Sequence, residues 1–301
     1  MIGRAERWLF AAGSAERLAA LRIGLCSVLA ARLATGRYAD LAGQPAALFR
    51  PRSFMHLLPS MPSRGLTLAL QAVGVCAAIL AAVGYRTRLT LPAAWVAGAF
   101  LAAMPSSMGK VVHNDVLLLL CLLPLVPAPA GDAWSLGGRR GPAPPPSVRY
   151  GWPVRTAMVV VAGSYLFVGL GKVLHAGPAW VTSDNLRWVM LASSDAHADP
   201  NHLALFVAGH PLLARGIAAA TLAFELTFPL ALVRSRLVPL YVAGAVAMHL
   251  GIYLTMGLDY SVHAATVVVV LVDWPALAQR IRARGPIRAV PVRASARVVR
   301  W

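Results

Sequence analysis

Residues 159–175 read VVVAGSYLFVGLGKVLH, an apolar run that ends in a lysine and a histidine. A membrane-spanning helix needs about 20 mainly apolar residues to cross roughly 30 Å of hydrocarbon, so this run predicts such a helix. Its lysine, Lys172, is one of only two lysines beside 26 arginines. An amine at the margin of a span is costly unless it is solvated or paired, which makes Lys172 a functional candidate. The alternative is that its stem lies along lipid and its charge reaches the headgroups.

The composition of the whole chain extends this interpretation. Hydrophobic residues make up 58% of the 301 residues, charged residues only 13%, and the mean hydropathy is +0.65. A soluble core of this size would not hide so much apolar surface, so we expect an all-α, polytopic transmembrane helical bundle. The net charge of +17 could indicate binding of nucleic acid. The arginines, however, lie between apolar runs and in the tail, which favours contacts with the lipid bilayer and its anionic lipids at the cytoplasmic face, with no nucleic-acid partner.

Eight apolar segments have the length or composition of a span. They are 18–36, 65–84, 89–107, 114–130, 154–175, 214–233, 237–257 and 261–277. The fourth segment meets prolines early, so it is expected to be short or re-entrant, and the eighth has a short apolar centre. The chain is therefore predicted to consist of an interfacial lead-in (1–17), a transmembrane bundle (18–277) and a basic cytoplasmic tail (278–301).

Loop charges orient this bundle, because short cytoplasmic loops are richer in arginine and lysine. With the N-terminus inside, the inner segments hold 18 basic residues and the outer segments hold 7. The prediction is a multi-pass protein of the cell membrane with both termini cytoplasmic.

This topology brings polar side chains from three spans to one level near the outer surface. They are His113, Asn114 and Asp115 at the start of the fourth span, Lys172 and His175 at the end of the fifth, and His263 at the start of the eighth. Asn114 and Asp115 also suit a simpler role as caps of the fourth helix. Tyr165 and Lys172 are seven residues apart and His175 follows three later, so the three side chains can share one helix face.

Two further polar residues lie deeper. Glu225 has no cation within reach on its own helix, so its partner must come from another helix or the carboxyl must be protonated. His249 has Tyr253 one turn later on a face that could line a cavity. The alternative for His249 is a neutral imidazole hydrogen-bonded between helices.

No metal site is expected. His197, His202 and His210 lie in the long outer segment 176–213 without the tight spacing of metal ligands, and the three cysteines lie in different apolar runs. Trp180 and Trp188 in the same segment predict an interfacial helix or lid on the membrane surface.

Four segments in order carry a family resemblance. They are VVHNDVLLLLCLLPLVPAPAGDAWSL (111–136), YLFVGLGKVLHAGPAW (165–180), FELTFPLAL (224–232) and AMHLGIYLTMGLDYSVHAATVV (247–268). Together they resemble the bacterial HTTM proteins, whose membrane domain is shared with vitamin K-dependent gamma-glutamyl carboxylase. The resemblance extends over roughly residues 15–275.

The resemblance implies roles for particular residues. In the carboxylase, a lysine in the segment matched by Lys172 is the base that deprotonates the reduced quinone, and a histidine in the segment matched by His113 assists it. Oxygen and carbon dioxide are co-substrates, and His249 matches a further histidine of the family pattern. The chain ends soon after its last span, so carboxylation of a dedicated protein substrate is not implied.

Two functions therefore remain open on the sequence. The first is a membrane enzyme, carboxylase-like (a lyase) or a quinone-dependent oxidoreductase, with a quinol-type ligand in an outer-face cavity and Lys172 as general base. The second is a non-catalytic binding, transport or scaffold protein that works beside a soluble partner protein, with Glu225 and His249 as an internal network.

Overall fold

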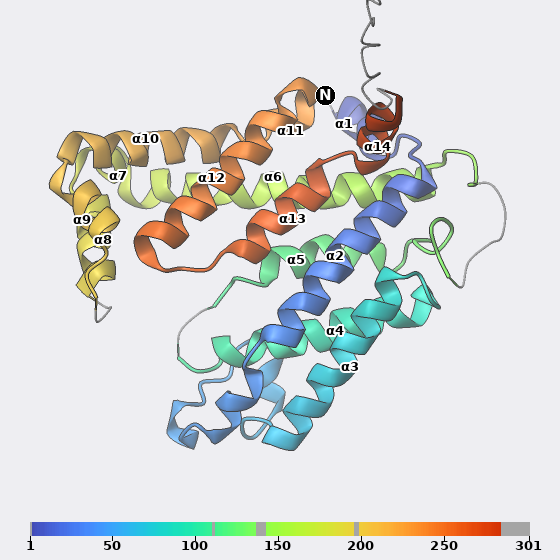
Figure 1. Cartoon of the computed structure of the whole chain (residues 1–301), viewed down its shortest axis with the longest axis horizontal. Helices are drawn as coiled ribbons and strands as arrows, with labels where there is room; N and C mark the ends of the chain where they lie inside the picture. Colours follow the sequence, from blue (N-terminus) through green and yellow to red (C-terminus); the bar gives the residue numbers. More distant parts are fainter. Residues whose placement is uncertain (1, 110–111, 137–142, 196–198, 284–301) are drawn as a thin grey trace, which may run out of the picture.

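The computed structural model describes residues 2–109, 112–136, 143–195 and 199–283, and within these ranges the ordered elements are helices (Figure 1). The α-helices are α1 (Ile2–Leu9), α2 (Ala15–Thr35), α3 (Arg64–Ala82), α4 (Thr87–Ser106), α5 (Val116–Leu122), α6 (Val148–Ala176), α7 (Ala179–Thr182), α8 (Asn185–Asp195), α9 (His202–Gly209), α10 (Pro211–Thr227), α11 (Leu230–Val233), α12 (Val238–Met256), α13 (Ser261–Leu271) and α14 (Trp274–Ala283). The predicted all-α bundle is confirmed. His197 and the part of the predicted tail after residue 283 lie outside the described residues.

Five of the described helices are long and apolar enough to cross a membrane: α2, α3, α4, α6 and α12. Two bent pairs also pass this test together, α9 with α10 across a 100° bend and α13 with α14 across a 67° bend, which raises the number to seven. The chain thus has the character of a multi-pass membrane protein. The predicted count of eight is approximate, because the fourth segment forms only α5 and the short 3₁₀ turn Leu123–Leu125.

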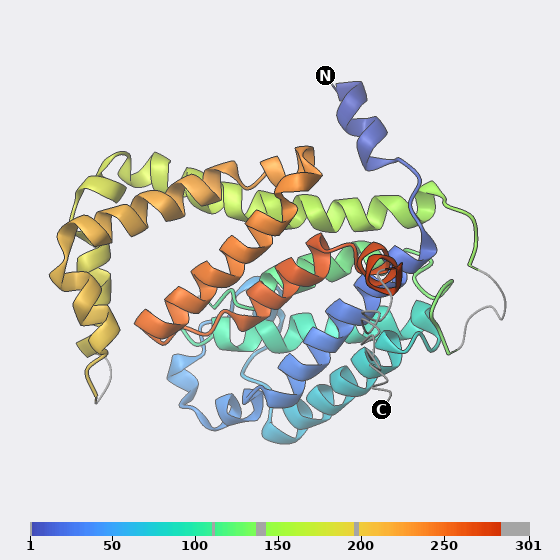
Figure 2. The same cartoon turned by 45° about the horizontal axis from the view of Figure 1, so that its top comes forward.

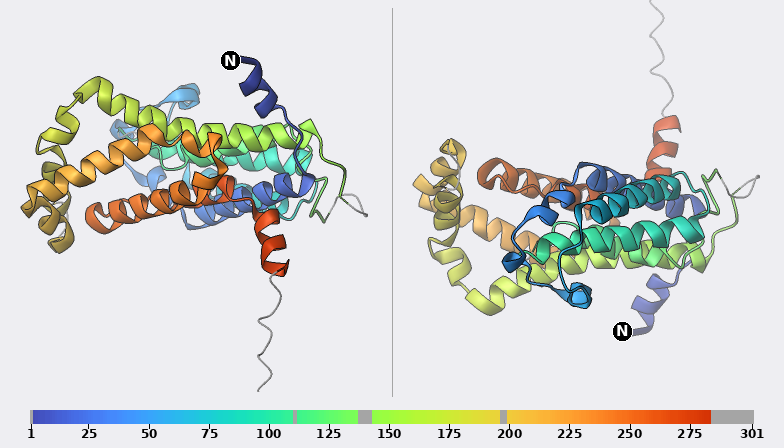
Figure 3. Two further views of the ribbon diagram at one scale, coloured as in Figure 1. Left: turned by 90° about the horizontal axis from the view of Figure 1, so that it is seen from above. Right: turned by 90° about the horizontal axis from the view of Figure 1, so that it is seen from below.

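The helices form two groups that meet along α2 and α6. Helices α2, α3 and α4 pack together on one side, while α10 lies along α6 and α12 lies beside α13 on the other (Figure 2). Helices α7, α8 and α9 form a bent arm at the C-terminal end of α6, and α1 and α14 lie at the opposite end (Figure 3). The arm occupies the segment for which an interfacial helix or lid is predicted.

Apolar side chains cover the outside of the bundle as well as its centre. Leu18, Leu25 and Leu118 are fully buried, yet Phe167 is 72% exposed and Leu240 is 65% exposed. Large apolar side chains exposed in this way on long apolar helices are compatible with hydrocarbon and costly in water.

One arginine of α2 explains how the short α5 is accommodated. Arg22 is completely buried, and its guanidinium donates hydrogen bonds to the backbone carbonyls of Ala130, Ala133, Trp134 and Ala82. Three of these carbonyls belong to the irregular chain that follows the prolines after α5. Non-helical backbone is tolerated inside a membrane bundle only where protein groups satisfy it, and Arg22 supplies those groups.

Replacing Arg22 by methionine should therefore destabilise the fold by about 3 kcal/mol or more, because it leaves several buried carbonyls without donors. The measurement is the free energy of unfolding in mixed micelles. The control is Arg88→Met, which removes an exposed arginine from the start of α4. Equal stability of the two variants would contradict the role given to Arg22.

Candidate functional site

Lys172 and Glu225 form an ion pair between α6 and α10. Lys172 Nζ lies 2.5 Å from Glu225 Oε1, and the two side chains are only 17% and 5% exposed. The prediction that Glu225 takes its partner from another helix is confirmed. Lys172 does not depend on headgroups for its counter-charge, because the partner is inside the protein.

The two helices come close at this point because α6 has a glycine there. A Cβ added at Gly169 would lie 3.0 Å from Glu225 Cβ and 3.2 Å from the backbone nitrogen of Leu226. Such contacts are tighter than most real ones, so a larger residue would push α10 away. On the other side of the pair, Lys172 Nζ lies 4.9 Å from the ring centroid of Trp180 in α7, a cation–π distance.

One turn of α6 closer to its start than Gly169, a second contact joins α6 to α12. The hydroxyl of Tyr165 and Nε2 of His249 are 2.9 Å apart and both residues are buried. The Tyr165 ring is stacked on Phe228, the residue that directly follows α10, with centroids 4.1 Å apart and planes inclined by 5°. Tyr165 and Lys172 therefore act on the same side of α6, as their spacing predicts, and each has a polar partner on a different helix.

His249 leads on to a group of aromatic and imidazole rings that we call the histidine cluster: His113, His249, Tyr260 and His263. His263 lies 5.7 Å from His249 and 5.3 Å from Tyr260, measured between ring centroids. His113 lies 6.4 Å from His263 and 5.9 Å from Tyr260. The cluster brings together residues from the chain before α5, from α12 and from the start of α13.

The chain before α5 is held by two polar contacts. Asn114 donates from its side-chain nitrogen to the carbonyl of Asp259 at 2.8 Å, which ties it to the turn before α13. In that turn the backbone N–H of Ser261 donates to the Asp259 carboxylate and lowers the pKa of that carboxyl. Asp259 thus stays ionised at neutral pH, beside the cluster.

Asp115 does not cap its helix through its side chain. It occupies the cap position of α5 without a side-chain capping bond, and both carboxylate oxygens accept from Arg32 of α2, at 2.7 Å and 3.2 Å. The simpler role as a cap is wrong for this residue. The physical reason is that the half-buried guanidinium of Arg32 offers two charge-assisted hydrogen bonds in place of the weaker amide donors.

Two predicted members of the site lie elsewhere. His175 is exposed and its Nδ1 donates to the carbonyl of Gly171 on its own helix, 2.7 Å away. Tyr253 is 54% exposed on the outer surface of α12. Helical spacing predicted that both residues share a face with site residues of their own helices, but both side chains point to the outside of the bundle.

Sequence reasoning missed Arg32, Tyr260 and Phe228. Arg32 lies within the predicted span 18–36, and the rule that marks Lys172 as a candidate applies equally to an arginine inside a span. Tyr260 and Phe228 carry no such signal, because an aromatic residue near a span end is common for other reasons.

Several buried polar atoms around the site have no hydrogen-bond partner in the described part of the protein. They are Glu225 Oε2, Trp180 Nε1, His249 Nδ1 and His263 Nδ1. Unpaired buried polar atoms are rare and call for a water, an ion or a ligand. Within the described residues no group of three or more potential metal ligands comes together, so the free atoms are better suited to hydrogen bonds than to metal coordination.

The chemistry open to the Lys172–Glu225 pair follows from its composition. An ammonium beside a carboxylate and an amine beside a carboxylic acid differ only in the position of one proton. When either form accepts a further proton, the product is an ammonium beside a carboxylic acid with one net positive charge. The pair can therefore accept a proton and, in the same step, stabilise the anion that this proton leaves behind.

Comparison of the chain with family models, with characterised proteins and with solved structures gives no match. The family resemblance consequently remains a prediction from the four segments, and the site has to be judged on its geometry.

The Arg32–Asp115 contact leads to a testable expectation. Asp115→Asn leaves Arg32 without its counter-charge, so it should destabilise the protein by about 3 kcal/mol. The control is Asp40→Asn, which breaks the exposed pairs of Asp40 (44% exposed) with Arg37 and Arg64 (88% and 69% exposed) and should cost less than about 1 kcal/mol. Unfolding of both variants in mixed micelles gives the comparison, and equal costs would show that the pair adds nothing.

Proposed function

We propose that this protein is a cell-membrane enzyme that binds a lipid-soluble molecule carrying a ring hydroxyl, a reduced quinone being the type, and removes its hydroxyl proton with the Lys172–Glu225 pair. The observation that carries the proposal is the buried pair itself, in which Glu225 Oε1 bonds Lys172 while Glu225 Oε2 has no partner. A hydroxyl group is the simplest donor for that free oxygen, and its proton lies within reach of both members of the pair.

The surroundings of the pair suit an aromatic ring. Trp180 places its ring against Lys172, and its Nε1 is a buried donor without an acceptor. Phe228 is buried about one helical turn from Glu225, and Tyr165 is buried about two turns from Lys172. A ring with two oxygen atoms offers a donor to Glu225 and an acceptor to Trp180, so the free atoms favour a molecule of this chemical class.

The proton step assigns roles to the two charged residues. Lys172 is the general base, and it takes the proton either directly or with Glu225 as the first acceptor. The ammonium that results remains beside the ring oxygen and compensates its negative charge. The contact between Tyr165 and His249 holds α6 against α12. His249 also belongs to the histidine cluster, which includes His113, and the family resemblance implies that His113 assists the base.

We further propose membership in the HTTM family, on the four ordered segments. A reduced quinone would supply, with oxygen, a base strong enough to remove a proton from carbon, and carbon dioxide would be the group added. The arginine distribution favours both termini in the cytoplasm, and with that orientation the C-terminal end of α6 and the site near it would lie toward the outer surface.

The second candidate is a non-catalytic binding, transport or scaffold protein. It is favoured by one property of the pair, namely that Lys172 and Glu225 neutralise each other and join two helices without any ligand. In that case a neutral pair of similar shape should preserve the activity of the protein.

Binding of a reduced short-chain menaquinone tests the proposal. The variant Lys172→Gln/Glu225→Gln keeps a hydrogen bond between the helices but has no charge and no base. We expect wild-type protein in mild detergent to retain co-purified quinone by mass spectrometry, and the double variant to bind the reduced quinone at least tenfold more weakly under anaerobic titration. His175→Gln, an exposed change on the same helix, should match wild type. The proposal would be overturned if no quinone co-purified with the wild-type protein and all three proteins bound the added reduced quinone equally.

The base is tested separately with Lys172→Arg. Arginine keeps the positive charge but stays protonated, so no free amine can form. We expect oxygen-dependent oxidation of the reduced quinone to fall by at least a hundredfold while the protein remains folded. Unchanged activity would exclude Lys172 as the base. Greater damage from Glu225→Gln than from any change at Lys172 would favour the non-catalytic candidate.

A further inference from the structure

A groove of about 890 Å³ lies at the end of the bundle that is remote from Lys172. Its walls come from the starts of α2, α6 and α12, the end of α13 and one side of α14. Its apolar lining includes Val154, Met158, Val238, Val242 and Leu271. Val154 and Lys172 are 18 residues apart on one helix, about 27 Å along its axis. The groove is therefore a different site from the one described above.

Four arginines and one aspartate line the polar part of this groove: Arg17, Arg155, Arg236, Arg280 and Asp273. Among the described residues, Arg17 alone of these arginines has a carboxylate partner, Asp273, at 3.1 Å. Arg155 donates to the backbone carbonyls of Ala11 and Ala12, which orients it without neutralising its charge.

Arg236 and Arg280 are exposed and form no ion pair within the described part of the chain. Three guanidinium groups thus line one groove with an apolar floor, and none of them has a carboxylate partner among the described residues. Guanidinium groups bind phosphate through paired hydrogen bonds, so phosphate is the anion that this arrangement favours.

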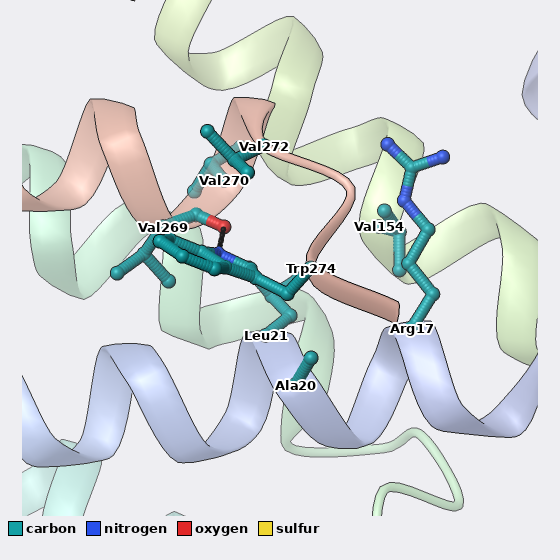
Figure 4. A pocket seen from close by; sticks show the side chains of 8 residues that line it. All are labelled: Arg17, Ala20, Leu21, Val154, Val269, Val270, Val272 and Trp274. Carbon is teal, nitrogen blue, oxygen red and sulfur yellow. Dashed lines mark hydrogen bonds between the residues drawn. The ribbon is translucent and has the colours of Figure 1, made fainter. Parts of the chain in front are cut away.

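The groove does not continue into the core. Beside it, Arg17 and Val154 also line a narrow crevice toward α2 (Figure 4). The indole of Trp274 fills that crevice and donates from Nε1 to the carbonyl of Val269 at 3.3 Å, leaving no space for a water molecule. A ligand of the groove must therefore enter from the outside of the bundle.

We propose that this groove binds one anionic phospholipid, with its phosphate at Arg155, Arg236 and Arg280 and its acyl chains against Val154 and Val242. A basic pocket between transmembrane helices on the cytoplasmic side is the typical site for such a headgroup. The chain's own residues after 283 do not supply the anion that the groove favours, because they include five arginines and no acidic residue. The arginines after residue 283 would be repelled by the arginines that line the groove.

Native mass spectrometry and thermal unfolding of the full chain in a non-ionic detergent test this site. The probes are phosphatidylglycerol, phosphatidylcholine and inorganic phosphate. The variant is Arg236→Gln/Arg280→Gln, in which both replaced side chains are exposed. The matched control is Arg88→Gln/Arg234→Gln, which removes the same charge from exposed arginines that do not line the groove.

We expect one phosphatidylglycerol per wild-type chain and a higher melting temperature when this lipid is added. The groove variant should bind it at least tenfold more weakly, while the control matches wild type. Equal weakening in the control would show a general surface-charge effect and overturn the site. Equal binding of phosphatidylcholine, or full competition by inorganic phosphate, would overturn the anionic lipid as its occupant.

Discussion

A cation inside an apolar helical bundle has to find its acceptors within the protein, and three cations of this chain do so. Arg22 is met by backbone carbonyls of Ala82 and of the chain after α5, Arg32 by Asp115, and Lys172 by Glu225. Each contact joins segments that are far apart in the sequence. Since an unpaired charge at these positions would cost several kcal/mol, the contacts constrain which helices can be neighbours.

The three contacts have different roles in the structure. Arg22 supports irregular backbone that would otherwise be unsatisfied, and Arg32 holds the segment that carries His113 and Asn114. Lys172 forms a contact of the same kind, but Glu225 keeps a free buried oxygen and Trp180 a free donor. Arg22 also keeps one unpaired buried atom, its Nε, but only the Lys172–Glu225 contact combines, within the described residues, an unpaired carboxylate oxygen with an unpaired indole N–H. A ring that carries hydroxyl groups would satisfy both atoms.

The architecture could be predicted from the sequence to a useful extent, because apolar segments of sufficient length have few alternatives in lipid. All eight predicted segments contain helix. The span count was less certain, since length and hydropathy do not reveal where a helix bends. Pro124, Pro127 and Pro129 signalled the short fourth segment. At the bend between α13 and α14, Asp273 and Pro275 form a helix-start pattern, which was not used.

The site could be predicted only in part. The need of Glu225 for a partner followed from its apolar surroundings, but the identity of that partner depended on helix packing. Asp115 and Arg32 are 83 residues apart, so the local role as a cap was the natural prediction and the long-range pair was not. Tyr253 and His175 were placed in the site wrongly for another reason. Helical spacing predicts which residues share a face of one helix, but it does not predict which face contacts the neighbouring helices.

Helix α6 has 29 residues, which corresponds to about 44 Å, whereas the hydrocarbon core of a bilayer is about 30 Å thick. Both the arginine-lined groove and the Lys172–Glu225 pair lie on this one helix. A helix that exceeds the hydrocarbon must tilt or extend into the headgroups, and the extent depends on the bilayer. The depth of Lys172 below the surface is therefore set by membrane thickness, which makes acyl-chain length a physical variable of the site.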